Sequence, residues 1–341
     1  MSVLVNQTGF QGEMLPAQDA DGRFRLVVVI KATCLVDLQG NVSLAPEQDA
    51  VTLADVFLGE PGRSSVVAAS DAALYKAATD IGLVGHAHAM AGTAATRMPV
   101  TLTVGPVRKR LLVIGDRVWE RGLGGLSISE AQPFTRMPLV YERAFGGSAE
   151  ETEEERNPAG VGFHVDAPDS GSPLPNIEDP SHLISSWSDR PAPQGFGFVP
   201  GNWQPRKSFV GTYDEAWKEE QFPLPPHDFD HRYFQASHPD LRCSPYLQGD
   251  EAVELVGVSP HGPLRFSLPG KALALSVQFR IGEPQRRLAA LDTLTFMPDD
   301  NKFHMVWRHP IQCPAKILDV ETVTAFPIRL STLQRLSHAP R

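Results

Sequence analysis

The stretch HDFDH, from His227 to His231, places two imidazoles and two carboxylates within five residues. These groups are the usual ligands of divalent metal ions in proteins. In an extended chain alternate side chains point to opposite sides, so both histidines would face one way and Asp228 and Asp230 the other. We therefore expect these groups to cap turns and to pair with nearby arginines, with no metal bound here. A metal site that uses a subset of them is the alternative.

Other residues could also support chemistry, but none forms a complete catalytic pattern. His86 and His88 could present two ligands on one face of a strand. Two carboxylates for glycoside hydrolysis would have to lie at a defined separation in space. The sequence offers four candidates for them: Glu142, Glu178, Asp214 and Asp228.

The remaining patterns predict no enzyme. No serine stands between the glycines of a nucleophile elbow, and the runs GLGG and GFGF lack the spacing of phosphate-binding loops. We expect no catalytic residues, no cofactor and no metal. A carboxylate- or metal-dependent hydrolase that uses the central Asp, Glu and His residues is the alternative.

Composition narrows the possible partners and compartments. The chain has 341 residues and a formal net charge of −9, which disfavours a nucleic-acid partner. Its first residues lack the pattern of a secretory signal, and no apolar run reaches the ~20 residues of a membrane span. Three widely spaced cysteines fit a reducing compartment. We expect a cytoplasmic protein without a membrane partner.

The first third of the chain predicts β-structure. FRLVVVIKATCLVD, from Phe24, is rich in β-branched residues and follows a turn signal. VTLTVGPVRKRLLVIGDRVWER contains three β-type runs separated by Gly105-Pro106 and Gly115-Asp116, which predicts an antiparallel meander with a tight turn at the second pair. The alanine-rich stretch 71–95 could hold one short helix before Gly82, and loops or strands are the alternative.

The C-terminal part is again β-rich. PLRFSLP, ALALSVQFRIG and LAALDTLTFMPDDNKFHMVWRHPI predict strands, and Pro298 to Asn301 separates the last two runs as a hairpin turn. Alternation in FHMVWRH places Phe303, Met305 and Trp307 on one side. The sequence thus predicts a mainly β protein, with two sandwich-like antiparallel lobes and few short helices.

The middle of the chain contains many prolines, glycines and aromatic residues and few periodic runs. So many aromatic side chains would expose a large apolar area unless they packed, so we expect an ordered, irregular segment. We divide one unit, 1–330, into an N-terminal β lobe (1–128), this central segment (129–245) and a C-terminal β lobe (246–330), followed by a tail (331–341).

An irregular segment has no sheet to satisfy its backbone groups, so polar side chains must do so. Arginine suits this role, because its planar group donates several hydrogen bonds at once. We expect four charged residues of the segment to be mostly buried and hydrogen-bonded: Arg143, Arg206, Asp214 and Asp230.

Several motifs, in a fixed order, resemble a family. They are IKATC (30–34), YERAFGG (141–147), NPAGVGF (157–163), LPNIE (174–178), GFGFVPGNWQPR (195–206), GTYDEAW (211–217), PLPPHDFDHRYF (223–234), GDE (249–251), MPDD (297–300) and VWR (306–308). Together they resemble a bacterial family of domains of unknown function that are encoded beside type VI secretion genes.

The resemblance implies an accessory adaptor or chaperone. Such a protein would bind a secreted effector with a PAAR-type tip domain and help to load it onto the VgrG spike. The family supplies no catalytic residues, so the matching positions are expected to determine the fold or the partner surface. These positions are Tyr141, Glu142, Arg143, Phe145, Asn157, Asn176, Trp203, Arg206, Tyr213, Asp214, Trp217, Asp228 and Asp230.

Overall fold

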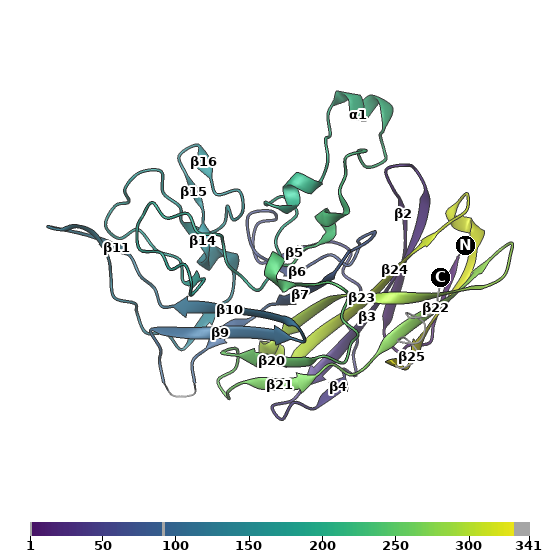
Figure 1. The fold of residues 1–341 in the computed structure, drawn as a ribbon, viewed down its shortest axis with the longest axis horizontal. Helices are drawn as coiled ribbons and strands as arrows, with labels where there is room; N and C mark the ends of the chain where they lie inside the picture. Colours follow the sequence, from purple (N-terminus) through teal and green to yellow (C-terminus); the bar gives the residue numbers. More distant parts are fainter. Residues whose placement is uncertain (1, 91–92, 331–341) are drawn as a thin grey trace.

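A computed structural model describes residues 2–90 and 93–330 and shows a mainly β architecture (Figure 1). Its largest sheet has ten strands. Seven follow one another in the order β1 (Val3–Asn6), β25 (Val320–Ile328), β22 (Ala272–Phe279), β23 (Gln285–Met297), β24 (Lys302–Gln312), β3 (Phe24–Val36) and β2 (Gln11–Gln18). Beside this path lie β4 (Val42–Leu44), β7 (Thr79–Leu83) and β19 (Arg242–Cys243).

A second sheet has five strands, in the order β18 (Ile177–Glu178), β10 (Val107–Ile114), β9 (Arg97–Val104), β20 (Ala252–Val256) and β21 (Leu264–Ser267). Short strand pairs complete the β-structure: β11 (Trp119–Gly122) with β12 (Gly125–Ile128), β13 (Arg136–Pro138) with β8 (His86–His88), β14 (Phe145–Gly146) with β17 (Val161–Gly162), β15 (Ser148–Ala149) with β16 (Thr152–Glu153), and β5 (Val56–Phe57) with β6 (Val66–Ala68).

Helical structure is short. α1 (Glu215–Glu220) is the only α-helix in the described residues. The 3₁₀ turns are η1 (Tyr141–Arg143), η2 (Arg206–Phe209), η3 (His231–Phe234), η4 (Pro239–Leu241), η5 (Pro298–Asp300) and η6 (Ile317–Asp319). No helix in the described ranges is long and apolar enough to cross a membrane.

The two ends of the described chain meet at the edge of the large sheet. β1 runs parallel to β25, with Val3 opposite Thr322, and the amide of Gln7 continues the pairing by donating to the Ala325 carbonyl at 2.8 Å. At the other end of the strand order lies β2, which follows β1 directly in the chain and contacts it. The large sheet is therefore nearly closed on itself.

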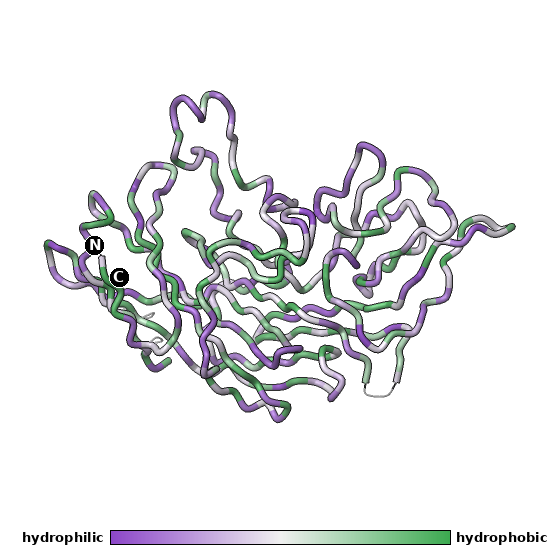
Figure 2. The backbone as a smooth tube through the Cα atoms, turned by 180° about the vertical axis from the view of Figure 1, so that it is seen from behind, coloured by the Kyte–Doolittle hydropathy of each residue, from purple (hydrophilic) through white to green (hydrophobic). Residues whose placement is uncertain are grey.

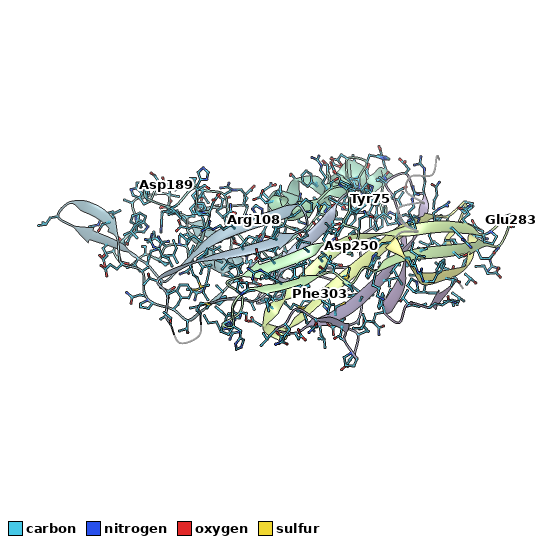
Figure 3. The ribbon with its side chains drawn as sticks, turned by 60° about the horizontal axis from the view of Figure 1, so that its bottom comes forward. Tyr75, Arg108, Asp189, Asp250, Glu283 and Phe303 are labelled. Atoms are coloured by element: carbon cyan, nitrogen blue, oxygen red, sulfur yellow. The ribbon has the colours of Figure 1, made fainter. Side chains whose placement is uncertain are left out.

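The central strands of the large sheet are buried on both faces. Phe303, Met305 and Trp307 of β24 lie in the main hydrophobic core, whereas Val306 packs with Val27 on the opposite side. Phe303 lies deep within the strands, while Glu283 stands at the end of the β22–β23 hairpin (Figure 3). Along the backbone, hydrophobic residues concentrate in the strands of the body and hydrophilic residues in many of the outer loops (Figure 2).

Most of the predicted strands are confirmed. The run from Phe24 forms β3, the runs around Gly105-Pro106 form the β9–β10 hairpin, and the late runs form β21 to β24. Gly105 adopts a φ of 51° at its turn, which suits a residue without a side chain. Both sheets combine strands from before residue 128 with strands from after residue 246, so the two ranges share their sheets.

Two local features need correction. The possible helix before Gly82 does not form, and the strand alternative holds, because Thr79–Leu83 is a buried strand that pairs in parallel with β23. The meander ends after β10, because β11 pairs with β12. Gly115 makes no tight turn to β11 but packs against the chain at Gln132, whose carbonyl oxygen would lie 1.7 Å from an added Cβ.

The central segment is ordered and largely irregular, as predicted, and its aromatic side chains pack. Phe196, Phe198 and Trp203 are at most 1% exposed. Phe196 and Trp203 join the main core, and Phe198 packs with Val66. The segment lies alongside the two sheets and rises above them at α1 (Figure 1).

Candidate functional site

Five segments that are far apart in sequence meet at one cleft of about 540 Å³. They are residues 58–67, the end of β7 with the start of β8, the residues leading into η1, Gly197, and the turn η5 between β23 and β24. The cleft thus joins parts of the YERAFGG, GFGF and MPDD motifs. Its lining includes Ser65, His86, Arg136, Tyr141, Gly197 and Asp299.

Asp299 joins the two histidines of β8 at this cleft. His86 Nδ1 and His88 Nε2 each lie 2.7 Å from a different oxygen of the Asp299 carboxylate. Arg136 Nη2 lies 3.6 Å from the same carboxylate. Burial alone would raise the pKa of Asp299, but hydrogen bonds from the two imidazoles outweigh it and hold this pKa below its usual range.

This arrangement favours a hydrogen-bonded link between β8 and η5 over a metal centre. Each imidazole is directed at its own oxygen, so the ring nitrogens bind the carboxylate itself. Within 2–90 and 93–330, no group of three or more His, Cys, Asp or Glu side chains could hold a metal ion. His86 and His88 therefore fix β8 to η5 in this structure.

Ser65, which lines the cleft, is held by Glu142. Glu142 accepts hydrogen bonds from the Ser65 amide at 2.8 Å and from the Ser65 hydroxyl at 2.5 Å. The same hydroxyl accepts from the Tyr141 amide at 2.8 Å. The Tyr141 ring is buried against the edge of Trp203, and this burial raises the pKa of its phenol. Glu142 thus satisfies backbone and hydroxyl donors.

Two asparagines complete the neighbourhood of η1. The Asn157 amide donates to the carbonyls of Tyr141 and Phe145 at 2.7 and 3.0 Å. Asn176 donates to the Ile114 carbonyl at 3.0 Å and accepts from Arg143 Nη1 at 2.9 Å. Phe145 is buried in a second apolar cluster. The predicted site residues from Tyr141 to Asn176 therefore hold irregular backbone in place.

Arg206 is the clearest case of a buried architectural arginine. It is 7% exposed, and it donates to the Val199 carbonyl at 2.6 Å and to the Tyr233 carbonyl at 2.8 Å. Its guanidinium also lies 5.0 Å from the centre of the Tyr233 ring. The prediction of burial is confirmed for Arg206. Arg143 is partly buried, with 35% of its side chain exposed, and it donates to Asn176 and Asp116.

A second group of predicted residues lies on a projecting arm, defined as residues 211–229, with α1 at its tip (Figure 1). The rings of Tyr213 and Trp217 are 4.6 Å apart, and those of Trp217 and Phe222 are 5.8 Å apart. Tyr213 and Phe222 are 53% and 68% exposed. Asp214 begins α1 by accepting from the Trp217 amide at 2.9 Å.

The acidic residues of HDFDH, one on the arm and one just after it, bind the chain locally. Asp228 accepts from the amide and hydroxyl of Thr212 at 3.0 and 2.8 Å. Asp230 accepts from the Arg232 amide and Nε, both at 2.8 Å. Asp214 is exposed, so the prediction of burial is wrong for this residue, and Asp230 is partly buried. Asp214 caps the first turn of an exposed helix, and this position keeps its carboxylate at the surface.

Sequence reasoning missed Asp299, Ser65 and Arg136 as members of the cleft. Asp299 was expected only as a turn residue, and no spacing rule links it to His86, which lies 213 positions away. The paired histidines were the one local signal for this site.

A protein-family model described as an uncharacterized protein conserved in bacteria (DUF2169) matches residues 21–308, and the chain belongs to this family. No curated protein and no solved structure matches the chain.

Proposed function

We propose that this member of the DUF2169 family is a cytoplasmic accessory adaptor, which binds a secreted effector with a PAAR-type tip domain and helps to load it onto the VgrG spike of a type VI secretion system. The ordered motifs provide the resemblance to proteins of this kind. Support from the molecule itself comes from the arm, which carries four of the motif aromatic and acidic positions away from the body (Figure 1).

The arm has the chemistry of a contact element for another protein. Tyr213 and Phe222 expose much of their rings, and Trp217 between them is held by a hydrogen bond from its indole to the Leu224 carbonyl at 2.9 Å. Rigid, exposed aromatic side chains are typical anchors of protein interfaces. The arm contains five carboxylates and one lysine. It therefore suits an apolar partner surface with a basic rim.

The use of the central carboxylates also favours an adaptor over a hydrolase. Glu142 binds Ser65, buried Glu178 binds Arg117 and the Ile184 amide, Asp214 caps α1 and Asp228 binds Thr212. A glycosidase needs two carboxylates that converge on one substrate pocket. Here each of these four carboxylates has its own structural partner in a different place.

Co-expression with the effector encoded beside this chain tests the proposal. The arm variant Tyr213→Ala/Phe222→Ser should leave the chain folded, because both side chains are largely exposed. We expect it to recover much less soluble effector than the unchanged chain. The matched control is Leu123→Ser, which removes a fully exposed apolar side chain elsewhere, at the β11–β12 turn, and should behave like the unchanged chain.

The opposite result is equally clear. If soluble effector is the same with and without this chain, and no complex survives gel filtration, the adaptor proposal is wrong. Hydrolysis of a polysaccharide or ester by the chain alone would then support the hydrolase alternative.

A further inference from the structure

A pocket lies between the base of the arm and strand β2. On the side of the arm it is lined by Tyr213, Pro225 and Phe229, and on the side of the body by Leu15 and Leu74. Its volume is about 270 Å³, below the roughly 300–1,000 Å³ of typical sites for small-molecule ligands. A cavity of this size suits one large side chain of another protein. It is called the arm pocket below.

The lining of the arm pocket on the side of the body is apolar. Val27 is buried there and packs with Val29 and Val306 in one of the core clusters. Leu15 and Leu74 pack against the same cluster but are only half-buried. An apolar side chain that entered the pocket would cover these half-buried residues and remove their apolar surface from water.

Three aromatic rings of the lining pack on one another. The ring of Phe229 lies 5.8 Å from that of Tyr233 and 5.5 Å from that of Phe234. Gln221 fixes the arm to the body, because its Nε2 donates to the Ala20 carbonyl at 2.6 Å. The pocket is therefore formed before a partner arrives, which lowers the entropic cost of binding.

The arm pocket offers no free charge to a charged occupant. Among the described residues that line it, Asp19 is the one carboxylate, and Arg25 already binds it at 3.0 Å. His231 is the one basic side chain of this lining. A cation inside the pocket would lack a free counter-charge, and its burial would be unfavourable. The occupant should therefore be an apolar side chain.

The charges of the arm above the pocket do not balance. Its one lysine, Lys218, pairs with Glu215 at 3.4 Å, and Arg232, just after the arm, pairs with Asp230 at 2.6 Å. The other four carboxylates of the arm form no ion pair with any described residue: Asp214, Glu219, Glu220 and Asp228. Negative charge without a counter-charge favours a partner segment with basic residues.

The charge of Asp228 reaches the arm pocket. Partial burial, then Tyr233 and the charge of Asp228, raise the pKa of Tyr213, which lines the pocket. Asp228 accepts its hydrogen bonds from the amide and hydroxyl of Thr212, which are neutral groups. Its negative charge therefore stays available to a basic residue beside the apolar side chain.

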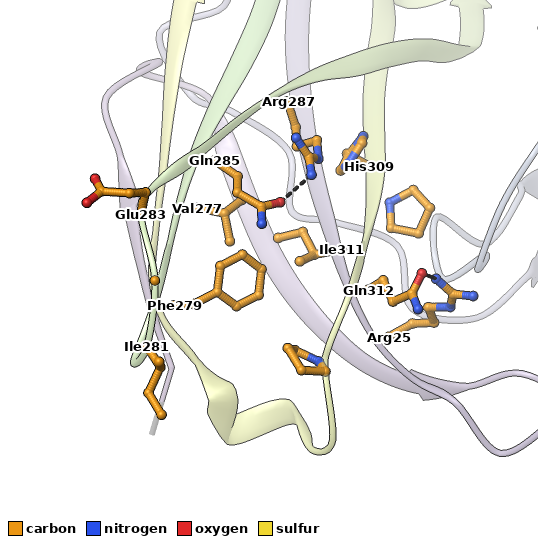
Figure 4. Close-up of a pocket in the computed structure, with 13 residues that line it drawn as sticks. Arg25, Val277, Phe279, Ile281, Glu283, Gln285, Arg287, His309, Ile311 and Gln312 are labelled. Carbon is orange, nitrogen blue, oxygen red and sulfur yellow. Dashed lines mark hydrogen bonds between the residues drawn. The ribbon is translucent and has the colours of Figure 1, made fainter. Parts of the chain in front are cut away.

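A second cavity, between the β22–β23 hairpin and the end of β24, lacks this combination (Figure 4). Its polar side chains bind one another, since Arg287 donates to Gln285, and Arg25 donates to Gln312 at 3.1 Å. Arg287 also donates to the Arg286 carbonyl at 2.9 Å. The arm pocket instead joins an apolar cavity to unpaired charges of one sign.

We propose that the arm pocket receives one large apolar side chain from a segment of the partner protein that carries lysine or arginine on both sides of it. The inference rests on the proposed adaptor function, and it names the surface and the chemistry of the contact. The apolar side chain would supply most of the affinity by filling the pocket. The basic residues would select this site through the carboxylates of the arm.

A designed peptide tests the proposal on the full chain. The probe is a fluorescein-labelled, terminally blocked heptapeptide with one tryptophan between two pairs of lysines and a glycine at each end. Fluorescence anisotropy measures its binding at low salt. We expect saturable binding that weakens at least about tenfold when alanine replaces the tryptophan, because the pocket then stays empty. A peptide with glutamates in place of the lysines should not bind, since like charges repel.

The variant Ala72→Trp tests the pocket from the side of the protein. Ala72 lines the pocket and is exposed, so a larger side chain there can fill the cavity without disturbing the core. We expect at least about tenfold weaker binding of the tryptophan peptide. Ala252→Trp on β20 is the control, because Ala252 is also exposed but lies outside the pocket, and it should bind as the unchanged chain does.

The exposed carboxylates of α1 test the selection of basic residues. Glu219→Gln/Glu220→Gln removes two charges and keeps the size of both side chains. We expect the lysine-containing peptide to bind roughly two- to fivefold more weakly, as is usual for exposed charges. Glu283→Gln, on the distant β22–β23 hairpin, is the control and should bind as the unchanged chain does.

Several results would refute the arm-pocket proposal. They are a lack of saturable binding of the tryptophan peptide, equal binding of its alanine counterpart, and undiminished binding by a folded Ala72→Trp protein. Equal binding by Glu219→Gln/Glu220→Gln and the unchanged chain would refute the role of the arm charges. The alanine peptide is tested on the unchanged chain, so the proposal can fail even if Ala72→Trp does not fold.

The two proposals can fail separately. A chain that keeps the co-expressed effector soluble but does not bind the tryptophan peptide refutes the arm pocket and leaves the adaptor function standing. A chain that binds the peptide in the expected manner but forms no complex with the effector refutes the adaptor function and leaves the arm pocket as a site for basic segments.

Discussion

Arg308 and Asp292 form a buried ion pair between neighbouring strands. Arg308 Nη1 lies 2.6 Å from Asp292 Oδ2, and the two side chains are 1% and 2% exposed. A bulge in β23 produces the pair, because Leu291 lies opposite Trp307 and Thr293 opposite Val306, so Asp292 has no partner in the ladder. Burial raises the pKa of Asp292, and Arg308 opposes this effect.

Removal of one member of this pair should strongly destabilise the fold. We expect Arg308→Met to lower the free energy of unfolding by about 3–5 kcal/mol, since it leaves a carboxylate buried without its partner. The double variant Arg308→Met/Asp292→Leu should recover part of this loss, because two apolar side chains leave no buried charge. Urea unfolding measures both. A loss below about 1 kcal/mol in Arg308→Met would contradict the expected role of the pair.

Arg206 should be required for folding. We expect the Arg206→Ala protein to misfold and to be recovered in the insoluble fraction after expression. The carbonyls of Val199 and Tyr233 would lose their hydrogen-bond donor. Lysine should not restore the protein, since a single ammonium group cannot reproduce the guanidinium geometry. The control is Arg232→Ala. The Arg232 side chain is 63% exposed, so we expect its removal to leave the protein folded and soluble. A stable, soluble Arg206→Ala protein would show that the residue has another role.

His238 should make stability depend on pH. Its Nδ1 accepts from Lys109 Nζ at 2.9 Å, and burial together with the Lys109 charge lowers the pKa of His238 from 6.5 to about 4. Between these values the unfolded chain binds a proton that the folded chain does not, so the free energy of unfolding should fall as the pH is lowered through this window. The expected fall is on the order of 3 kcal/mol.

The midpoint of urea-induced unfolding, measured at pH 6.5 and near pH 4.5, reports this dependence. His238→Asn should flatten it, because an amide oxygen can accept from Lys109 without binding a proton. His261→Asn changes an exposed histidine and is the control. If the free energy of unfolding changes equally with pH in His238→Asn and in the unchanged protein, His238 is not the cause of the pH dependence.

We expect freshly purified protein to carry no stoichiometric metal at HDFDH. Both oxygens of Asp228 are engaged by Thr212, and both oxygens of Asp230 by Arg232. Elemental analysis of the unchanged protein and of His227→Ala measures the metal content. One zinc, manganese or iron ion per chain that disappears in His227→Ala would support the hydrolase alternative.

The strands were predictable where their signals are local. β3 and the β23–β24 hairpin carry β-branched and alternating residues, and the turn between the latter two contains Asn301, which adopts a φ of 51°. β7 was not predictable, because its alanine-rich surroundings favour a helix. Pairing with β23 on one side and β19 on the other overrides this local preference.

The candidate site was predictable only in part. Motif positions such as Asn157 and Arg206 could be expected to bind backbone, because an irregular segment needs such partners. Their exposure could not be predicted, since Asp214 serves an exposed helix start and Arg206 a buried turn. The meeting of Asp299 with His86 and His88 depends on a tertiary contact between a turn and a distant strand, which no local pattern encodes.

The parallel pairing of β1 and β25 has a mechanical consequence. Tension applied to the chain before Val3 and after Ile328 would pull these strands in opposite directions along their axes. The hydrogen bonds between them, together with the one from Gln7 to Ala325, would then be loaded in shear and would share the force. A force perpendicular to the strands would instead break the hydrogen bonds between β1 and β25 one after another. The protein should therefore resist being stretched from its ends more strongly than being pulled at its projecting arm.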